Sequence, residues 1–384
     1  MRIVGLMSGT SVDSIDAALI DIHGQGYDLT IKVLGSNTLD YPEVLRTQIL
    51  QVCGGKPLSV STLADLDDQI AQQFAIAAQT LIQTHGKVDL IASHGQTVFH
   101  RPCPPATAPV SLAYSVQLGR GALIAWLTGC PTVSNFRAAD IAAGGEGAPL
   151  VPPVDLALLS HDHHHRCIQN IGGIGNVTVL PPRSAPTAPL GWDTGPGNSL
   201  IDIAVHHFSQ GTQRFDRDGQ WSAQGQICGP LLEIWLSHPY FLQKPPKSTG
   251  RETFGWDFFQ HCLQQAQPYD LSAADLLATF TELTVVSIVQ SYERFLPRLP
   301  DQVLVCGGGS RNGYLMARLQ QKLPNIPITP TDRAGVPSDL KEAIAFAVLG
   351  FWHYQGWTGN LTTVTGAQWP VILGEIAWPR QPPG

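Results

Sequence analysis

Apolar runs and polar glycine turns alternate near the start of the chain. Residues 2–7 and 15–22 are mostly apolar, the second run with partial alternation, so both predict β-strands. Gly9, Thr10 and Ser11 lie between them. Because Gly, Ser and Thr favour turns, this pattern predicts a β-hairpin with a polar tip.

The same arrangement of strand, glycine turn and strand recurs further along. Residues 166–170 and 177–180 predict strands on either side of Gly172 and Gly173. This repetition suggests that the chain has two related halves. A third predicted strand, residues 303–305, leads into the turn Gly307, Gly308 and Gly309.

Helical periodicity is clearest between residues 63 and 84, where apolar residues recur every three or four positions. Ser59 precedes this segment and Gly86 follows it, as is usual for helix ends. Helical spacing also occurs at residues 276–295, 314–323 and 340–352. Residues 88–92 predict a buried strand that ends in a polar turn at residues 93–96. The alternation of strands and helices indicates an α/β protein, in which ligands gather at the carboxyl ends of strands.

Residues 138–153 have no regular periodicity and are rich in small residues, Gly and Pro. Such a composition is typical of a crossing between domains. We therefore predict an N-terminal domain of residues 1–140 plus about 345–384, and a C-terminal domain of residues 141–344.

Composition narrows the function classes. The 384 residues are enough for two or three domains, and a charged share of only 14% suits large apolar cores. The net charge is −7 and no basic run occurs, so nucleic acid is not an expected partner. No stretch of about 20 apolar residues and no signal sequence is evident, so we expect no membrane association and a cytoplasmic location. The seven cysteines contain no Cys-x-x-Cys pair, which favours reduced thiols.

The three glycine turns, near residues 9, 172 and 308, each follow a predicted strand. Glycine turns expose backbone N–H groups and can hold phosphates. The alternative is that glycine only permits positive φ in tight hairpins. Neither a Walker A sequence nor a strand-linked G-x-G-x-x-G is present, so P-loop and Rossmann sites are excluded.

An ordered set of motifs resembles the anhydro-N-acetylmuramic acid kinases, in the sugar kinase, Hsp70 and actin superfamily. The motifs are residues 5–16, 93–97, 136–137, 144–150, 170–176, 192–198, 307–312, 341–346 and 364–367. They span nearly the whole chain. The chain departs from the family at Ser14, where glycine is usual, and at Asn135, where aspartate is usual.

The resemblance implies two actin/hexokinase-like α/β domains around a central cleft. It implies ATP and Mg²⁺ as cofactors, 1,6-anhydro-N-acetylmuramic acid as substrate, and a homodimer. The implied reaction opens the 1,6-anhydro ring with water and transfers the γ-phosphate to O6, in peptidoglycan recycling. The implied nucleotide-binding residues are Gly9, Thr10, Ser11, Asp13, Asp16, Gly172, Gly173, Asn176, Gly307, Gly308, Gly309 and Asn312, with the last glycine turn against adenosine.

Asp193 is the candidate catalytic base, because water must lose a proton to attack the anomeric carbon. It lies in the segment Trp-Asp-Thr-Gly-Pro-Gly-Asn, whose glycines and proline predict a tight, rigid turn. The alternative is an aspartate that only caps this turn.

The family motifs also imply substrate-binding roles for Arg137, Thr97 and Glu342. The guanidinium of Arg137 suits the substrate's carboxylate, the alternative being a structural salt bridge. Thr97 and Glu342 are expected to bind sugar hydroxyls. His94 is expected to be a structural turn histidine and not an acid.

For Asp13 and Asp16, orienting Mg²⁺ through water and stabilising the hairpin remain equal alternatives, and no direct metal ligand is assigned. Two other functions stay open: a chaperone-like nucleotide-binding protein on the same scaffold, and a kinase with a different sugar.

Overall fold

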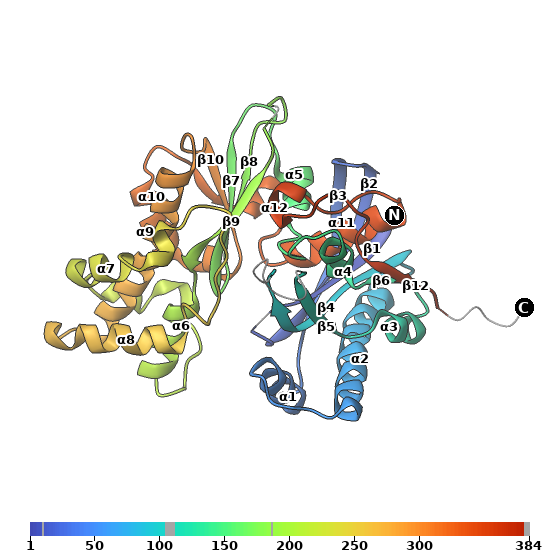
Figure 1. The fold of residues 1–384 in the computed structure, drawn as a ribbon, viewed down its shortest axis with the longest axis horizontal. Helices are drawn as coiled ribbons and strands as arrows, with labels where there is room; N and C mark the ends of the chain where they lie inside the picture. The colour runs from blue at the N-terminus through green and yellow to red at the C-terminus, as the bar shows by residue number, and fades with distance from the viewer. Residues whose placement is uncertain (10, 104–111, 186, 380–384) are drawn as a thin grey trace, which may run out of the picture. The chain divides into compact units, whose positions relative to one another are not determined.

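The computed structural model describes residues 1–9, 11–103, 112–185 and 187–379 (Figure 1). The chain divides into two compact units. Unit 1 comprises Met1–Leu159 and Leu340–Gly384, and unit 2 comprises Ser160–Asp339. Each unit is built from helices packed on a mixed β-sheet, so the predicted α/β class with two domains is confirmed.

Unit 1 contains, among its described residues, a seven-stranded sheet of order β12-β6-β4-β1-β2-β3, with β5 paired to β4. The predicted first hairpin is confirmed, because β1 and β2 pair antiparallel, while β1, β4 and β6 run parallel. The strands are β1 (Arg2–Ser8), β2 (Ser14–Gln25), β3 (Asp28–Asp40), β4 (Leu90–Arg101), β5 (Tyr114–Leu118), β6 (Thr132–Ser134) and β12 (Glu375–Ala377).

The helices of unit 1 are α1 (Glu43–Cys53), α2 (Val60–His85), α3 (Gly121–Thr128), α4 (Phe136–Ala142), α5 (Pro152–Leu159), α11 (Lys341–Tyr354) and α12 (Thr362–Thr365). Helix α2 is the predicted amphipathic helix. The side chain of Ser59 accepts a hydrogen bond from the Thr62 N–H, and Gly86 ends the helix with φ of 82°. Its apolar face, including Phe74, is buried in the core of unit 1.

Helix α11 lies directly on the central strands β1, β2 and β4. Gly5 permits this approach, because a Cβ there would collide with the backbone of Ala343. Gly350 plays the same part against Ala92 of β4. At Gly5 the contact is therefore made between backbones, whereas at Gly350 the helix backbone meets the Ala92 methyl group.

Unit 2 contains, within the described chain, a five-stranded sheet of order β11-β10-β7-β8-β9. The strands are β7 (Arg166–Ile171), β8 (Ile174–Leu180), β9 (Leu190–Pro196), β10 (Gln302–Cys306) and β11 (Ile328–Pro330). The α-helices are α6 (Ser199–Phe208), α7 (Gly229–Leu236), α8 (Trp256–Ala266), α9 (Ala273–Phe295) and α10 (Gly313–Lys322). Short 3₁₀ helices are η1 (Arg217–Gly219), η2 (Ser222–Gln224), η3 (Pro239–Leu242), η4 (Gln267–Tyr269), η5 (Gly308–Arg311) and η6 (Thr331–Ala334).

Helix α9 is the central helix of unit 2. Ser272 and Asp275 form a capping box at its start, and most of its residues are buried. Within the described residues it is the helix long and apolar enough to cross a membrane, but 72% of the apolar window is buried inside the protein. Core helices of globular units commonly have this composition.

The two sheets repeat one topology, as the paired strand and turn patterns suggested. In each, a central strand (β1 or β7) starts an antiparallel meander of three strands. On its other side it pairs parallel with the next long strand, β4 or β10. A further parallel strand follows, β6 or β11.

One prediction about the fold is wrong, and another differs from the structure in its bounds. Residues 93–96 form no terminal turn, because β4 continues through them to Arg101 and accommodates Gly95 as a bulge with φ of 75°. The domain boundaries also differ, since unit 1 extends to Leu159 and resumes at Leu340. Residues 141–159 belong to unit 1 because α5 packs on α11 and β3.

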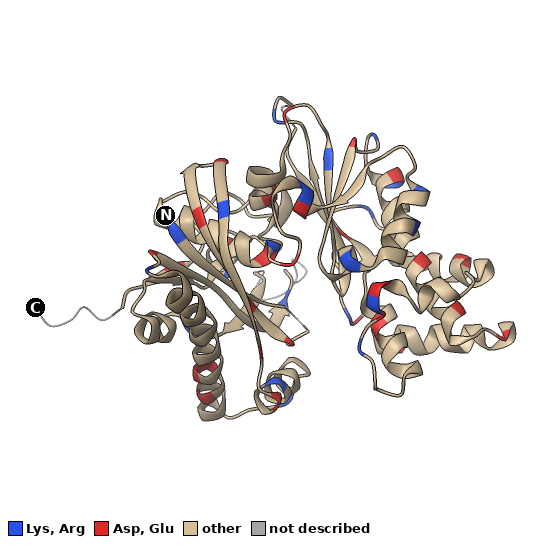
Figure 2. Ribbon diagram, turned by 180° about the vertical axis from the view of Figure 1, so that it is seen from behind, with Lys and Arg blue, Asp and Glu red and all other residues tan. Residues whose placement is uncertain are grey.

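An ion pair joins the two places where the chain leaves and re-enters unit 1. Lys341 Nζ lies 2.8 Å from Asp155 Oδ1 and 3.0 Å from Oδ2, and the two side chains are 8% and 3% exposed. Figure 2 shows that most other charged positions are scattered over the helices and strand ends. Burial makes this pair sensitive to loss of one partner, because the remaining charge has no water to solvate it.

We expect Asp155→Asn to lower the free energy of unfolding by about 3–5 kcal/mol, because it leaves the Lys341 ammonium buried without its counter-charge. The double variant Asp155→Leu with Lys341→Met should recover most of this loss. Asp68→Asn, which breaks the exposed Arg120 pair, is the matched control and should cost about 1 kcal/mol or less. Urea titrations measure all three, and equal losses for the buried and exposed variants would contradict the argument.

Candidate active site

Asp193 lies within strand β9 of unit 2, so the predicted turn around it is wrong. The ladder between β8 and β9 pairs Gly175 with Gly195 and Asn176 with Asp193, which leaves Thr194 as the extra residue of a β-bulge. Bulges re-aim neighbouring side chains and occur often beside active sites. The Asp193 carboxyl is thus carried by a bulged strand and not by the predicted turn.

A segment distant in sequence holds the Asp193 carboxyl and backbone. The Thr249 N–H donates to Asp193 Oδ2 at 2.9 Å, and the Asp193 N–H donates to the Lys247 carbonyl at 3.1 Å. The Tyr240 hydroxyl donates to the Asp193 carbonyl at 2.7 Å. The Thr249 hydroxyl is buried and has no hydrogen-bond partner among the described residues.

Burial raises the pKa of Asp193 to about 6. The Thr249 N–H and the charge of Lys247 oppose this shift, and the charge of Glu252 adds to it. Burial also lowers the pKa of Lys247 to about 8. Its ammonium lies 4.5 Å from the centre of the Tyr240 ring. Asp193 is therefore mostly ionised at neutral pH, yet more basic than an ordinary aspartate.

The second glycine turn is anchored by the start of helix α6. The N–H groups of Gly197 and Ser199 donate to the Gly173 carbonyl at 2.9 and 3.0 Å, and that of Asn198 to the Gly172 carbonyl at 2.7 Å. No atom lies within 4 Å of the position a Cβ would take on Gly173. The turn is thus rigid on one side and open on the other.

The third glycine turn lies against the second. A Cβ on Gly307 or Gly309 would collide with Ile171 at the end of β7, so packing alone requires glycine at both positions. Gly308 has more space, its nearest neighbour being the Asn198 amide at 3.8 Å. That amide also donates to the Ile171 carbonyl at 3.0 Å. The structure therefore brings two of the three predicted turns together.

Two predicted nucleotide-binding asparagines have structural contacts. Asn312 caps helix α10, its Oδ1 accepting from the Leu315 N–H at 2.9 Å. Asn176 pairs with Asp193, and its carbonyl accepts from the Gln169 amide at 3.0 Å. Their proposed contacts with nucleotide stay predictions.

The first hairpin tip, in unit 1, is held by local contacts. Gly9 accepts hydrogen bonds from the Val12 N–H and the Gln96 amide, and Ser11 lies beside it. Thr10 lies outside the described residues. Asp13 pairs with Arg46 at 2.9 Å, which supports the hairpin role.

Asp16 and Thr97, also in unit 1, lie on neighbouring parts of its sheet. Asp16 on β2 accepts from the Thr38 hydroxyl at 2.9 Å. Thr97 on β4 accepts from the Gln117 amide at 3.1 Å. Both residues are half-buried, and these contacts test neither predicted role.

Arg137 lies in the first turn of α4 and makes no ion pair among the described residues. Its Nη1 donates to the Gly147 carbonyl at 2.7 Å, and its Nε and Nη2 donate to His94. Burial lowers the pKa of Arg137 to about 10, opposed by the charges of Glu342 and Asp140. It is still a cation at neutral pH. The alternative of a structural salt bridge therefore finds no support in these contacts.

Glu342 occupies the first turn of α11. Its side chain reaches solvent, yet surrounding protein displaces enough water to raise the pKa of its carboxyl. Lys341 and Arg137 oppose this shift, while Asp16 and Asp155 add to it. The carboxyl thus lies in the same electrostatic environment as two other predicted residues, Asp16 and Arg137.

The sequence did not predict the residues that hold the Arg137 and Asp193 side chains in place. Asp140, fully buried, accepts from the Gly147 N–H, the Asn360 amide and the Thr365 hydroxyl, and so fixes the loop that binds Arg137. The sequence signal for this support is that Asp140 lies between two of the family motifs and Thr365 lies within a third. Nothing in the sequence pattern linked Thr249 to Asp193.

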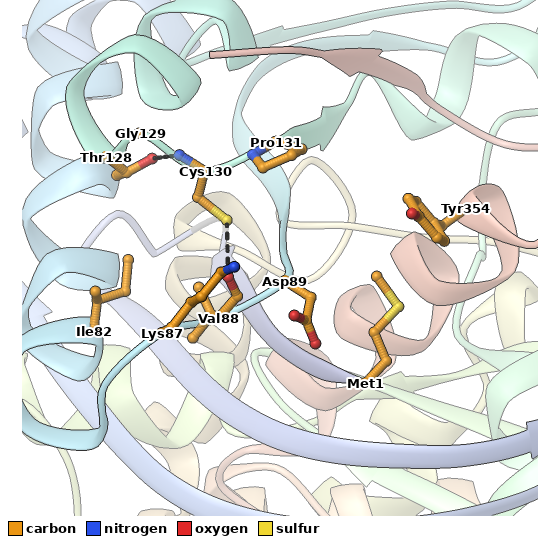
Figure 3. Close-up of a pocket in the computed structure, with 10 residues that line it drawn as sticks. All are labelled: Met1, Ile82, Lys87, Val88, Asp89, Thr128, Gly129, Cys130, Pro131 and Tyr354. Atoms are coloured by element: carbon orange, nitrogen blue, oxygen red, sulfur yellow. Dashed lines mark hydrogen bonds between the residues drawn. The ribbon is translucent and has the colours of Figure 1, made fainter. Parts of the chain in front are cut away.

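A cavity of about 530 Å³ lies at the other end of the unit 1 sheet, where β1, β4 and β6 begin (Figure 3). Its lining includes Met1, Lys87, Asp89, Cys130 and Tyr354. None of the predicted site residues lines it. Among the described residues, no group of three or more His, Cys, Asp or Glu side chains could hold a metal ion, and the seven cysteines, all described, form no disulfide.

Comparisons with known proteins give one family over nearly the whole chain. The model of the family described as anhydro-N-acetylmuramic acid kinase matches residues 1–379. The anhydro-N-acetylmuramic acid kinase of Rippkaea orientalis is 57% identical, covering 99% of this chain and 100% of that protein. That of a Cyanothece species is 56% identical, covering 98% and 99%. A solved structure, the activator of 2-hydroxyisocaproyl-CoA dehydratase from Clostridium difficile with bound ADPNP, gives a TM-score of 0.46 at 11% identity, covering 92% of this chain and 96% of that one. This last likeness is too distant to carry an argument.

The raised pKa of Asp193 predicts a pH-dependent stabilisation by Asp193→Asn. The folded protein holds this proton up to pH of about 6, whereas an unfolded aspartate loses it near 3.8, so ionisation costs stability as pH rises between these values. The variant avoids that cost and still accepts from Thr249. We expect little gain at pH 4 and about 1–3 kcal/mol above pH 7, discounted for partial exposure. Thermal and urea unfolding across pH measure it, and a gain independent of pH would argue against a raised pKa.

Proposed function

The chain belongs to the anhydro-N-acetylmuramic acid kinase family, and we propose that it opens the ring of 1,6-anhydro-N-acetylmuramic acid and phosphorylates O6 with ATP. The observation that carries this proposal is the full-length match at 57% identity. The product would be N-acetylmuramic acid 6-phosphate, an intermediate of cell-wall recycling. We also propose a cytoplasmic location and a homodimer.

The glycine turns of unit 2 support binding of ATP there. Gly173 and Gly308 offer backbone where a phosphate or the adenosine could approach closely, because no side chain blocks them. The anchored carbonyls of Gly172 and Gly173 keep the turn in one conformation. We assign this turn and the Gly9 tip as phosphate-binding loops, and residues 307–309 as the contact for adenosine.

Mg²⁺ would neutralise charge on the phosphates when ATP is bound. It usually keeps several waters and takes only one or two carboxylates, so we propose an ion held mainly by ATP and water. Asp13 and Asp16 would orient this ion through water, and neither is assigned as a direct ligand.

Asp193 would act as the base. Its carboxylate takes a proton from water, the water oxygen bonds to C1 of the sugar, and the C1–O6 bond breaks. The freed O6 then bonds to the γ-phosphorus as the bond to ADP breaks. The Thr249 N–H would hold the carboxylate in place through Oδ2. A pKa of about 6 suits a base that works near neutral pH.

Unit 1 would contribute the groups that bind the sugar. Arg137 is a cation without a carboxylate partner among the described residues, which suits the carboxylate of the lactyl group. Thr97 and Glu342 would bind sugar hydroxyls. In this proposal the cation binds the carboxylate, and the hydroxyl and carboxyl side chains bind the sugar hydroxyls.

With ATP, Mg²⁺ and 1,6-anhydro-N-acetylmuramic acid in ¹⁸O-labelled water, we expect a 6-phosphate that carries the label at C1 and not on phosphorus. The reason is that water attacks the anomeric carbon, whereas O6 attacks the phosphate. Mass spectrometry of the product locates the label. Labelled inorganic phosphate without sugar phosphate would overturn the proposal. If the enzyme turns over another sugar faster than 1,6-anhydro-N-acetylmuramic acid, the proposed substrate is wrong.

For Asp193→Asn we expect kcat to fall by about a thousandfold or more, because the water loses its base. Sugar and nucleotide dissociation constants, measured by calorimetry, should change by less than about tenfold. Glu252→Gln, which removes a neighbouring exposed charge, is the control and should keep kcat within about threefold. Near-normal kcat in a folded Asp193→Asn enzyme would move the base elsewhere, with Glu342 the next carboxylate to test.

A further inference from the structure

The His94 ring is held by the strand in which it lies. The side chain is 3% exposed, and its Nδ1 lies 2.9 Å from the Gly95 carbonyl. A carbonyl can only accept, so Nδ1 carries the hydrogen. The positive φ of Gly95, at the bulge of β4, brings that carbonyl round to the ring. The ring also packs on Phe346 of α11, with centroids 4.6 Å apart.

The other ring nitrogen is therefore an acceptor. Nε2 lies 2.9 Å from Arg137 Nη2 and 3.3 Å from Arg137 Nε, both of which can only donate. Burial and the charge of Arg137 hold the pKa of His94 well below its usual range, so the ring is neutral. Both nitrogens are occupied, which leaves the imidazole no capacity as an acid or base.

The guanidinium of Arg137 is thereby fixed on two sides. His94 takes Nε–H and one hydrogen of Nη2, and the Gly147 carbonyl takes one hydrogen of Nη1. A guanidinium has five N–H groups. Of these, one on each terminal nitrogen has no partner among the described residues. Two such groups on neighbouring nitrogens match the two oxygens of a carboxylate.

We propose that His94 is a positioning residue, whose neutral Nε2 locks the Arg137 guanidinium so that its two remaining N–H groups receive the substrate's carboxylate. This rests on the proposed function, in which Arg137 binds that carboxylate. Without the acceptor, the long side chain regains its rotamers and loses the bidentate geometry. The effect falls on substrate binding and not on the chemical step.

The test compares His94→Ala, His94→Gln and Arg137→Ala, alone and combined, by steady-state kinetics with 1,6-anhydro-N-acetylmuramic acid. We expect His94→Ala to raise KM about tenfold or more, as for loss of a charged hydrogen bond, and to change kcat by less than about threefold. His94→Gln should restore much of the affinity, because its amide oxygen can accept from Arg137. In the Arg137→Ala background, His94→Ala should add nothing.

His100→Gln is the matched control. This exposed histidine lies on the same strand and bonds the Ser115 hydroxyl instead, so its loss should leave KM unchanged. If Arg137→Ala raises KM but His94→Ala does not, or if the two effects add, the positioning role is wrong while the proposed function stands. If Arg137→Ala itself leaves KM unchanged, the assignment of the carboxylate to Arg137 is wrong. A loss of kcat that Gln does not restore would mark His94 as structural only.

Discussion

The backbone contact between helix α11 and strand β1 determines where the candidate residues of unit 1 lie. Gly5 admits the helix onto the sheet, and the helix begins at Lys341, which pairs with buried Asp155. That start places the Glu342 carboxyl within the electrostatic field of Asp16 and Arg137. One turn later Phe346 packs on His94, which accepts from Arg137. A side chain larger than hydrogen at Gly5 would have to separate helix from sheet, and these contacts would separate together.

In unit 2, hydrogen bonds and not a helix–strand contact fix the position of the candidate residues. The first N–H groups of a helix have no partner within it, and those at the start of α6 are given to the carbonyls of the Gly172–Gly173 turn. The start of the helix therefore holds the turn. The residues before α6 also include Asp193, so a single stretch from β9 into α6 fixes both the carboxyl and the turn. Kinase chemistry relies on such positioning, because phosphoryl transfer needs little covalent help from the protein.

The sequence predicts those features that depend on local periodicity, and misses those that depend on a partner strand. The first hairpin, helix α2 and the β7–β8 pair were predictable because neighbouring residues determine them. The bulges at Gly95 and Thr194 were not, since a bulge exists only relative to the strand opposite. Thr249 lies 56 residues from Asp193 in the chain, and no spacing rule connects them. The candidate residues came from family motifs, whereas their supporting contacts required the fold.

The Asp193 carboxyl shows why those supporting contacts matter. Burial pushes its pKa upward, and a carboxyl that stayed protonated at neutral pH would be useless as a base. A carboxylate with several N–H partners would have the opposite fault, because its pKa would fall and it would bind a proton too weakly. One N–H from Thr249 and the partial charge balance of Lys247 and Glu252 leave the pKa at about 6, between these limits. The bulge at Thr194 and the segment after Lys247 therefore act together: the first aims the carboxyl and the second sets its basicity.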